Sequence, residues 1–65
     1  MKFHFSVYRH GAEDWYGPFH EPDRLACKMT AARFARTYLH DTPLRVCFSV
    51  EGEDQECFHI YPEKS

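Results

Sequence analysis

The chain has 65 residues, of which 43% are hydrophobic and 17% aromatic, and its formal net charge is −2. This length allows one small core, and the aromatic content excludes a disordered peptide, because each ring removes a large apolar area from water. No apolar run approaches the ~20 residues that a membrane-spanning helix requires. We therefore expect a single small domain over residues 1–65 without a membrane segment.

The charge is distributed unevenly along the chain. Residues 22–40 carry four basic residues and one acidic residue, whereas residues 46–65 carry one basic residue and five acidic residues. A folded domain with this distribution has an electrically polarised surface.

The first third of the sequence predicts two strands. Apolar and polar residues alternate over residues 3–8, which is typical of a strand with one buried face. Residues 10–14 then indicate a turn. An extended segment resumes at Trp15, but Pro18 cannot donate to a strand ladder. We therefore expect the second strand to be short and to lie at an edge of the sheet.

The segment from Pro22 to His40 predicts the one helix of the chain. Pro22 suits the first helical position, and Asp23 suits the positive end of the helix. With Leu25 placed at 0° on a wheel of about 100° per residue, the apolar residues gather in one half, and Phe34 is the expected main anchor on the sheet. This apolar half contains Leu25, Cys27, Ala31, Ala32, Phe34, Ala35, Tyr38 and Leu39.

Two further strands follow the helix. Apolar residues alternate over residues 44–51 and again over residues 57–61. The two apolar sets share a face only if the connection has an odd length, and a three-residue turn over residues 52–54 satisfies this. The sequence therefore predicts an α+β fold with ββαββ order, in which one helix packs on one face of an antiparallel sheet.

Acidic residues concentrate in the predicted turns and form the candidate partner-binding site. Four of them lie within six positions of the last hairpin, and two lie in the first turn, which we expect to be close by. The site consists of Glu13, Asp14, Glu51, Glu53, Asp54 and Glu56. Such a cluster can imitate nucleic-acid phosphates or dock on a basic protein surface. The alternative is a solvated turn whose charges only prevent association.

The three cysteines, Cys27, Cys47 and Cys57, are an odd set, and no secretory leader precedes Phe3. We therefore expect reduced thiols in a cytoplasmic protein. Cys47, Cys57, His59 and His4 are candidate zinc ligands, but no short-spaced ligand pair occurs twice. We expect neither a metal site nor a cofactor.

Two nucleic-acid-binding surfaces remain as an alternative. One is the basic face of the helix, with Arg24, Lys28, Arg33 and Arg36. The other is the open face of the sheet, where aromatic residues could stack bases. The acidic hairpin opposes strong binding to phosphates, so we do not expect direct nucleic-acid binding. The sequence also lacks a phosphate-binding loop, a nucleophile elbow and a His-Glu-x-x-His motif, so we do not expect an enzyme.

The short reading frame from Met1, the minimal aromatic αβ core and acidic turns such as Glu51-Gly52-Glu53-Asp54 resemble the small phage-encoded inhibitors known as anti-CRISPR proteins. This resemblance implies a non-catalytic inhibitor in the cytoplasm of a phage-infected bacterium. Its partner would be a CRISPR–Cas surveillance complex with a basic DNA path. Binding there would block target-DNA recognition.

Overall fold

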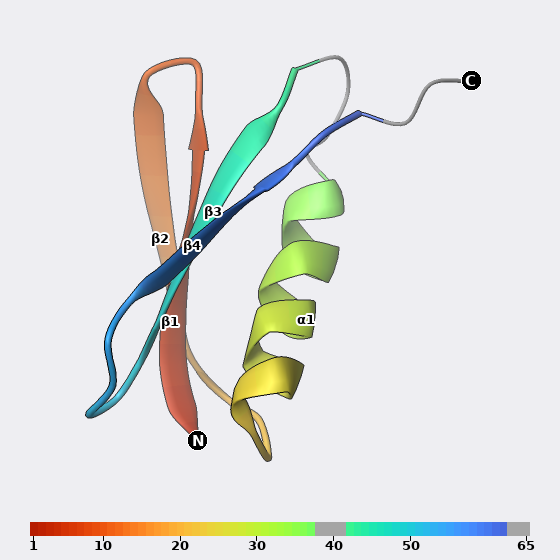
Figure 1. The fold of residues 1–65 in the computed structure, drawn as a ribbon. Coiled ribbons are helices and arrows are strands. Elements are labelled where there is room, and N and C mark those ends of the chain that lie inside the picture. The colour runs from red at the N-terminus through yellow and green to blue at the C-terminus, as the bar shows by residue number, and fades with distance from the viewer. Residues whose placement is uncertain (38–41, 63–65) are drawn as a thin grey trace.

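The computed structural model describes residues 1–37 and 42–62. The elements are β1 (Lys2–Arg9), β2 (Ala12–His20), α1 (Arg24–Arg36), β3 (Leu44–Val50) and β4 (Glu56–Ile60). The four strands form one antiparallel sheet in the order β2-β1-β3-β4, and α1 lies across one face of it (Figure 1). The predicted α+β fold with ββαββ order is confirmed. No helix among the described residues is long and apolar enough to cross a membrane.

The loop between β1 and β2 is shorter than predicted. It contains only His10 and Gly11, which both have positive φ angles, 52° and 80°. Two-residue hairpin loops with this backbone match the right-handed twist of the strands they connect. Glu13 and Asp14 are therefore strand residues of β2. The turn predicted over residues 10–14 ends at Gly11, because β2 begins at Ala12.

β2 lies at an edge of the sheet, as predicted, but it is nine residues long rather than short. Gly17 and Pro18 do not end the strand, because together they oppose the single residue His4 in a β-bulge. Gly17 has a φ angle of 127°, and a Cβ atom there would lie 2.9 Å from the His4 ring. The extra residue places both Tyr16 and Phe19 on the helix-covered face, although they are three positions apart.

The helix begins two residues later than predicted. Asp23 has an extended backbone, and its side chain accepts a hydrogen bond of 2.8 Å from the backbone N–H of Ala26. This is the role of an N-cap, because the first turn of a helix leaves backbone donors without partners. Pro22 therefore precedes the helix, and Arg24 is its first residue. The helix ends at Arg36, with Thr37 as its C-cap, and the predicted last residue, His40, lies outside the described residues.

Among the described residues of the predicted apolar half, only Leu25 is wrongly placed, and Tyr38 and Leu39 lie outside the described residues. The buried residues of α1 are Cys27, Ala31 and Ala35, which are small and let the helix approach the sheet closely. Leu25 is 65% exposed. The apolar stripe that packs on the sheet is therefore centred on Ala31, and Leu25 lies on the flank of the helix beside β4.

Phe34 is a partly buried anchor on the β2 side of the helix. Its ring centroid lies 5.1 Å from that of Phe5 and 4.6 Å from that of Tyr16. Phe5 also stacks on Phe19 at 5.4 Å. Aromatic rings at these distances add to the energy of area burial. This cluster attaches the edge strand β2 to the core.

The core lies between α1 and the sheet. Its buried members are Phe3, Phe5, Val7, Cys27, Ala31, Ala35, Leu44, Val46, Phe48, Val50 and Ile60. The β3–β4 pairing places Val46 opposite Phe58 and so keeps both apolar sets on the helix side, as the parity argument requires. The connection is longer than predicted, because residues 51–55 separate the two strands. A backbone hydrogen bond of 3.0 Å from Glu53 to Val50 closes its first turn.

Cys47 and Cys57 oppose each other across β3 and β4 and form a disulfide, with a Cα–Cα distance of 4.0 Å. The predicted reduced state is therefore wrong for these two cysteines. Cys27 is a free, buried thiol, so the odd count reflects one bridge and one core residue. The bridge occupies two of the four candidate zinc ligands. The cytoplasmic location stays a prediction, but reduced cysteines no longer support it.

Candidate functional site

The six predicted site residues lie at two places. One is beside the β1–β2 loop and the other is at the β3–β4 loop, and these loops are at opposite ends of the sheet (Figure 1). Glu13 pairs with Tyr8 near the end of β1, and Asp14 lies beside it on β2. Glu51 instead adjoins the start of β1, where its backbone N–H donates to the carbonyl oxygen of Lys2 at 3.0 Å. Lys2 and Tyr8 are six positions apart along β1, which corresponds to roughly 20 Å. The expected proximity of the two acidic groups is therefore wrong.

Glu21 and Asp23 take the place of Glu13 and Asp14 beside the hairpin. The backbone N–H of Glu21 donates to Met1 at 3.0 Å, so β1 begins between Glu21 and Glu51. Asp23 caps the helix whose first residue contacts the hairpin. We call this surface the acidic end, and it consists of Glu21, Asp23, Glu51, Glu53, Asp54 and Glu56. The contribution of residues 21 and 23 could not be deduced without the strand order.

Two basic residues of α1 bind the β3–β4 loop to the helix. Arg24 contacts Glu53 at 2.9 Å and Glu56 at 3.3 Å, and it also donates to the carbonyl oxygen of Asp54 at 3.3 Å. Lys28 contacts Glu56 at 3.2 Å. The guanidinium of Arg24 also lies 5.0 Å from the centre of the Phe48 ring. These contacts fix the position of the loop relative to the core.

The carboxylates of the acidic end differ in their partners. The hydrogen bond from Lys28 lowers the pKa of Glu56, and the nearby Arg24 adds to this effect. Within residues 1–37 and 42–62, the side chains of Glu51 and Asp54 form no ion pair. Two carboxylates of the loop are thus compensated internally, and two are available to a partner.

The same contacts divide the basic face of the helix. Arg24 and Lys28 neutralise acidic residues, whereas Arg33 and Arg36 form no ion pair in the described part of the chain. A continuous row of four free cations, as the nucleic-acid alternative requires, is therefore not present on α1. Instead, the molecule has its acidic end at the helix start and two arginines at the helix end.

The Glu13 carboxylate contacts neighbouring side chains on the open face of the sheet. The hydroxyl of the fully buried Ser6 donates to Glu13 at 3.1 Å, and Arg45 lies 4.0 Å from the same carboxylate. The guanidinium of Arg45 covers the Tyr8 ring at 4.8 Å. Trp15 lies beside this group and is 49% exposed. This face combines aromatic rings with a balanced charge pair.

The acidic end projects from the core and is built by backbone contacts and ion pairs between distant segments. Its chemistry is that of a fixed array of carboxylates, which attracts cationic groups on a partner. Comparison of the chain with protein-family models, curated proteins and solved structures finds no match.

Proposed function

We propose that the protein is a non-catalytic, protein-binding inhibitor that places its acidic end on a basic surface of its partner. The observation that supports this proposal is the gathering of six carboxylates at one end of the sheet, with the hairpin loop held by Arg24. A fixed loop loses little conformational entropy on binding, so its charges can contribute to affinity. Within residues 1–37 and 42–62, Glu51 and Asp54 are the hairpin carboxylates that form no ion pair.

The resemblance to anti-CRISPR proteins suggests the kind of partner. A CRISPR–Cas surveillance complex holds its target DNA in a positively charged channel. Carboxylates at the acidic end would occupy positions that phosphates otherwise take, and the inhibitor would then compete with target DNA. Attraction between the two surfaces would mainly accelerate association, and added salt would weaken it.

The test uses two variants that remove the same charge from opposite ends of the sheet. Glu51→Gln changes the acidic end, and Asp14→Asn is the matched control on β2. Binding to purified CRISPR–Cas surveillance complexes of several types is measured by surface plasmon resonance at low and high salt. Displacement of target DNA is measured in parallel.

We expect Glu51→Gln to slow association several-fold and Asp14→Asn to have no effect, because rim charges act chiefly on the association rate. If the wild-type protein binds none of the complexes, the CRISPR partner is refuted. If it binds but tolerates both Glu51→Gln and high salt, the acidic end is not the contact surface.

The open sheet face supports a second candidate function, a small nucleic-acid-binding regulatory module. The exposed Trp15 and the Arg45–Tyr8 pair offer flat groups on which bases could stack. Gel shifts with single-stranded RNA and DNA test this alternative, with Trp15→Ala as the variant. A shift that Trp15→Ala abolishes would favour the module over the inhibitor.

A further inference from the structure

β4 presents an unpaired strand edge. Adjacent pairs in an antiparallel ladder alternate between hydrogen-bonded pairs and closer pairs without hydrogen bonds. The 4.0 Å Cα separation of Cys47 and Cys57 is that of a close pair. The backbone groups of Cys57 and His59 therefore point away from β3. Because β4 is the last strand in the sheet order, these groups have no strand partner among the described residues.

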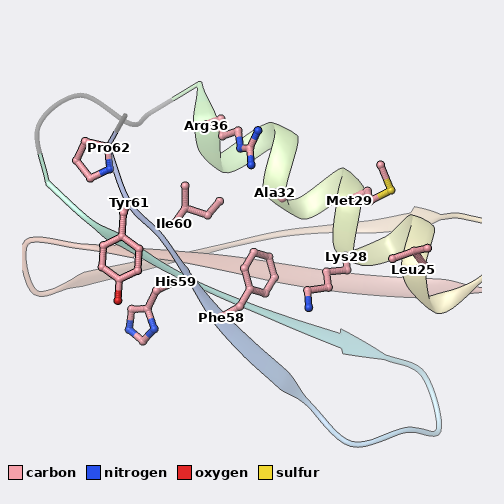
Figure 2. A pocket seen from close by; sticks show the side chains of 10 residues that line it. All are labelled: Leu25, Lys28, Met29, Ala32, Arg36, Phe58, His59, Ile60, Tyr61 and Pro62. Atoms are coloured by element: carbon pink, nitrogen blue, oxygen red, sulfur yellow. The ribbon is translucent and has the colours of Figure 1, made fainter. Parts of the chain in front are cut away.

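A groove runs between this edge and the flank of α1 (Figure 2). Its volume is about 740 Å³. The helix contributes one stripe with heptad-like spacing, and β4 contributes two apolar side chains to the floor. The residues concerned are Leu25, Met29, Ala32 and Arg36 on α1 and Phe58 and Ile60 on β4. Leu25 and Met29 are 65% and 46% exposed. An apolar helix stripe beside a free strand edge needs a partner that covers both.

The two ends of the groove differ in charge. At the end where α1 begins, Arg24 and Lys28 pair with Glu53 and Glu56, and Asp54 is the nearby carboxylate that forms no ion pair in the described part of the chain. Arg36 lies at the other end, close to Pro62, and forms no ion pair within the described residues. A copy of this chain placed antiparallel along β4 would bring its own acidic loop beside Arg36. The surface is therefore complementary to itself under a two-fold rotation.

We propose that two copies of the chain associate through their β4 edges. Hydrogen bonds between the outward backbone groups of Cys57 and His59 extend the two sheets into one eight-stranded antiparallel sheet, with the axis near Phe58. Both helices then lie on the same face, and their Leu25 and Met29 side chains meet over the joined grooves. Asp54 of one copy approaches Arg36 of the other. This surface shares Asp54 with the acidic end but does not include Glu51. Its main support is the free β4 edge and the groove, which do not depend on the inhibitor function.

The first test measures the mass of the purified protein by light scattering and sedimentation over a dilution series. We expect a dimer that dissociates on dilution. Leu25→Glu should raise the dissociation constant by about tenfold or more, because it places a charge in the apolar seam. This side chain is exposed in the monomer, so the change should not unfold it. Trp15→Glu, an equal change on the open face, is the control that should keep the dimer.

A charge exchange tests the antiparallel arrangement. Arg36→Glu and Asp54→Arg should each weaken the dimer, and the double variant should restore it, because the pair is reformed across the axis. A wild-type protein that stays monomeric at every concentration overturns the proposal, as does a dimer that Leu25→Glu leaves intact. A monomer that binds an extended peptide along β4 also overturns it, since the occupant is then another protein. A double variant without recovery refutes the antiparallel register.

Discussion

The two edges of the sheet are built differently. On β2, the bulge at Gly17 and Pro18 interrupts the regular ladder, and an edge proline cannot donate to an added strand. β4 is a regular strand of five residues without proline or lysine. The first edge is thus protected against pairing with another strand, and the second is available for it. A small sheet can therefore restrict association to one side by the local sequence of its edge strands.

The edges also differ in what attaches them to the core. Tyr16 and Phe19 of β2 stack on rings of β1 and α1. β4 is joined to β3 by the Cys47–Cys57 disulfide, and its Phe58 ring packs edge-on against that of Phe48 at 6.2 Å. An aromatic cluster that includes the helix thus attaches one edge, and a covalent bond reinforces the other. Each attachment can be removed separately.

The largest effect is expected from Phe34→Ala, which removes the aromatic attachment of β2. Replacing a buried Phe with Ala costs about 3–5 kcal/mol, and partial burial places Phe34 near the lower limit. Because small domains have little stability in total, urea unfolding should shift strongly. Hydrogen exchange should accelerate more in β2 than in β4. The control is Arg33→Ala on the exposed side of α1, which should change stability by less than about 0.5 kcal/mol. Equal effects of the two substitutions would contradict the helix phase.

Removal of the disulfide is expected to have the second largest effect. The bridge closes a loop between residues separated by ten positions, and the chain-entropy account gives about 2–3 kcal/mol for such a loop. The double variant Cys47→Ser/Cys57→Ser should lower the urea midpoint and increase hydrogen exchange mainly in β4. Reduction of the wild-type protein should reproduce the effect. If exchange rises equally in β2, the two edges are not independent.

Gly17→Ala should be less costly and should act on the β2 edge alone. The positive φ angle and the short distances from a Cβ atom to His4 both oppose a side chain at this position. We expect a loss of about 1–3 kcal/mol by thermal unfolding. Gly52→Ala is the matched control, because Gly52 also has a positive φ angle but no atom near its Cβ position. A control as costly as Gly17→Ala would show that the bulge contact is unimportant.

The smallest effect concerns the pH dependence of the Glu56 ion pairs. Because the folded protein lowers the pKa of Glu56, its contribution to stability is complete above the ordinary Glu pKa and is lost as pH falls through the folded value. The wild-type protein should therefore lose slightly more stability than Glu56→Gln between neutral pH and about pH 3. Urea midpoints at several pH values give the comparison. Parallel curves would mean that Lys28 and Arg24 do not stabilise the loop.

The sequence predicted the element order because alternation and helix signals are local properties. It did not predict the length of β2, because a bulge is indicated only by Gly17 and Pro18, which also resemble a strand end. The sequence did not predict the disulfide, because an odd cysteine count favours a reduced set, whereas strand register brings Cys47 and Cys57 together. The acidic end was predicted in part. Glu21 belongs to the acidic end only because the start of β1 lies between Glu21 and Glu51. The pattern of apolar and polar residues does not indicate this pairing.

The central position of β1 has a consequence for the rate of folding. The β1–β2 and β3–β4 hairpins connect neighbouring segments, and such hairpins form within microseconds. The β1–β3 pairing joins residues as far apart as Phe3 and Val50. Closing such a long loop is entropically costly before any contact is gained. We therefore expect the β1–β3 pairing to limit the folding rate. Substitutions at Val7 or Val46 should slow folding, whereas changes at the β4 edge should mainly accelerate unfolding.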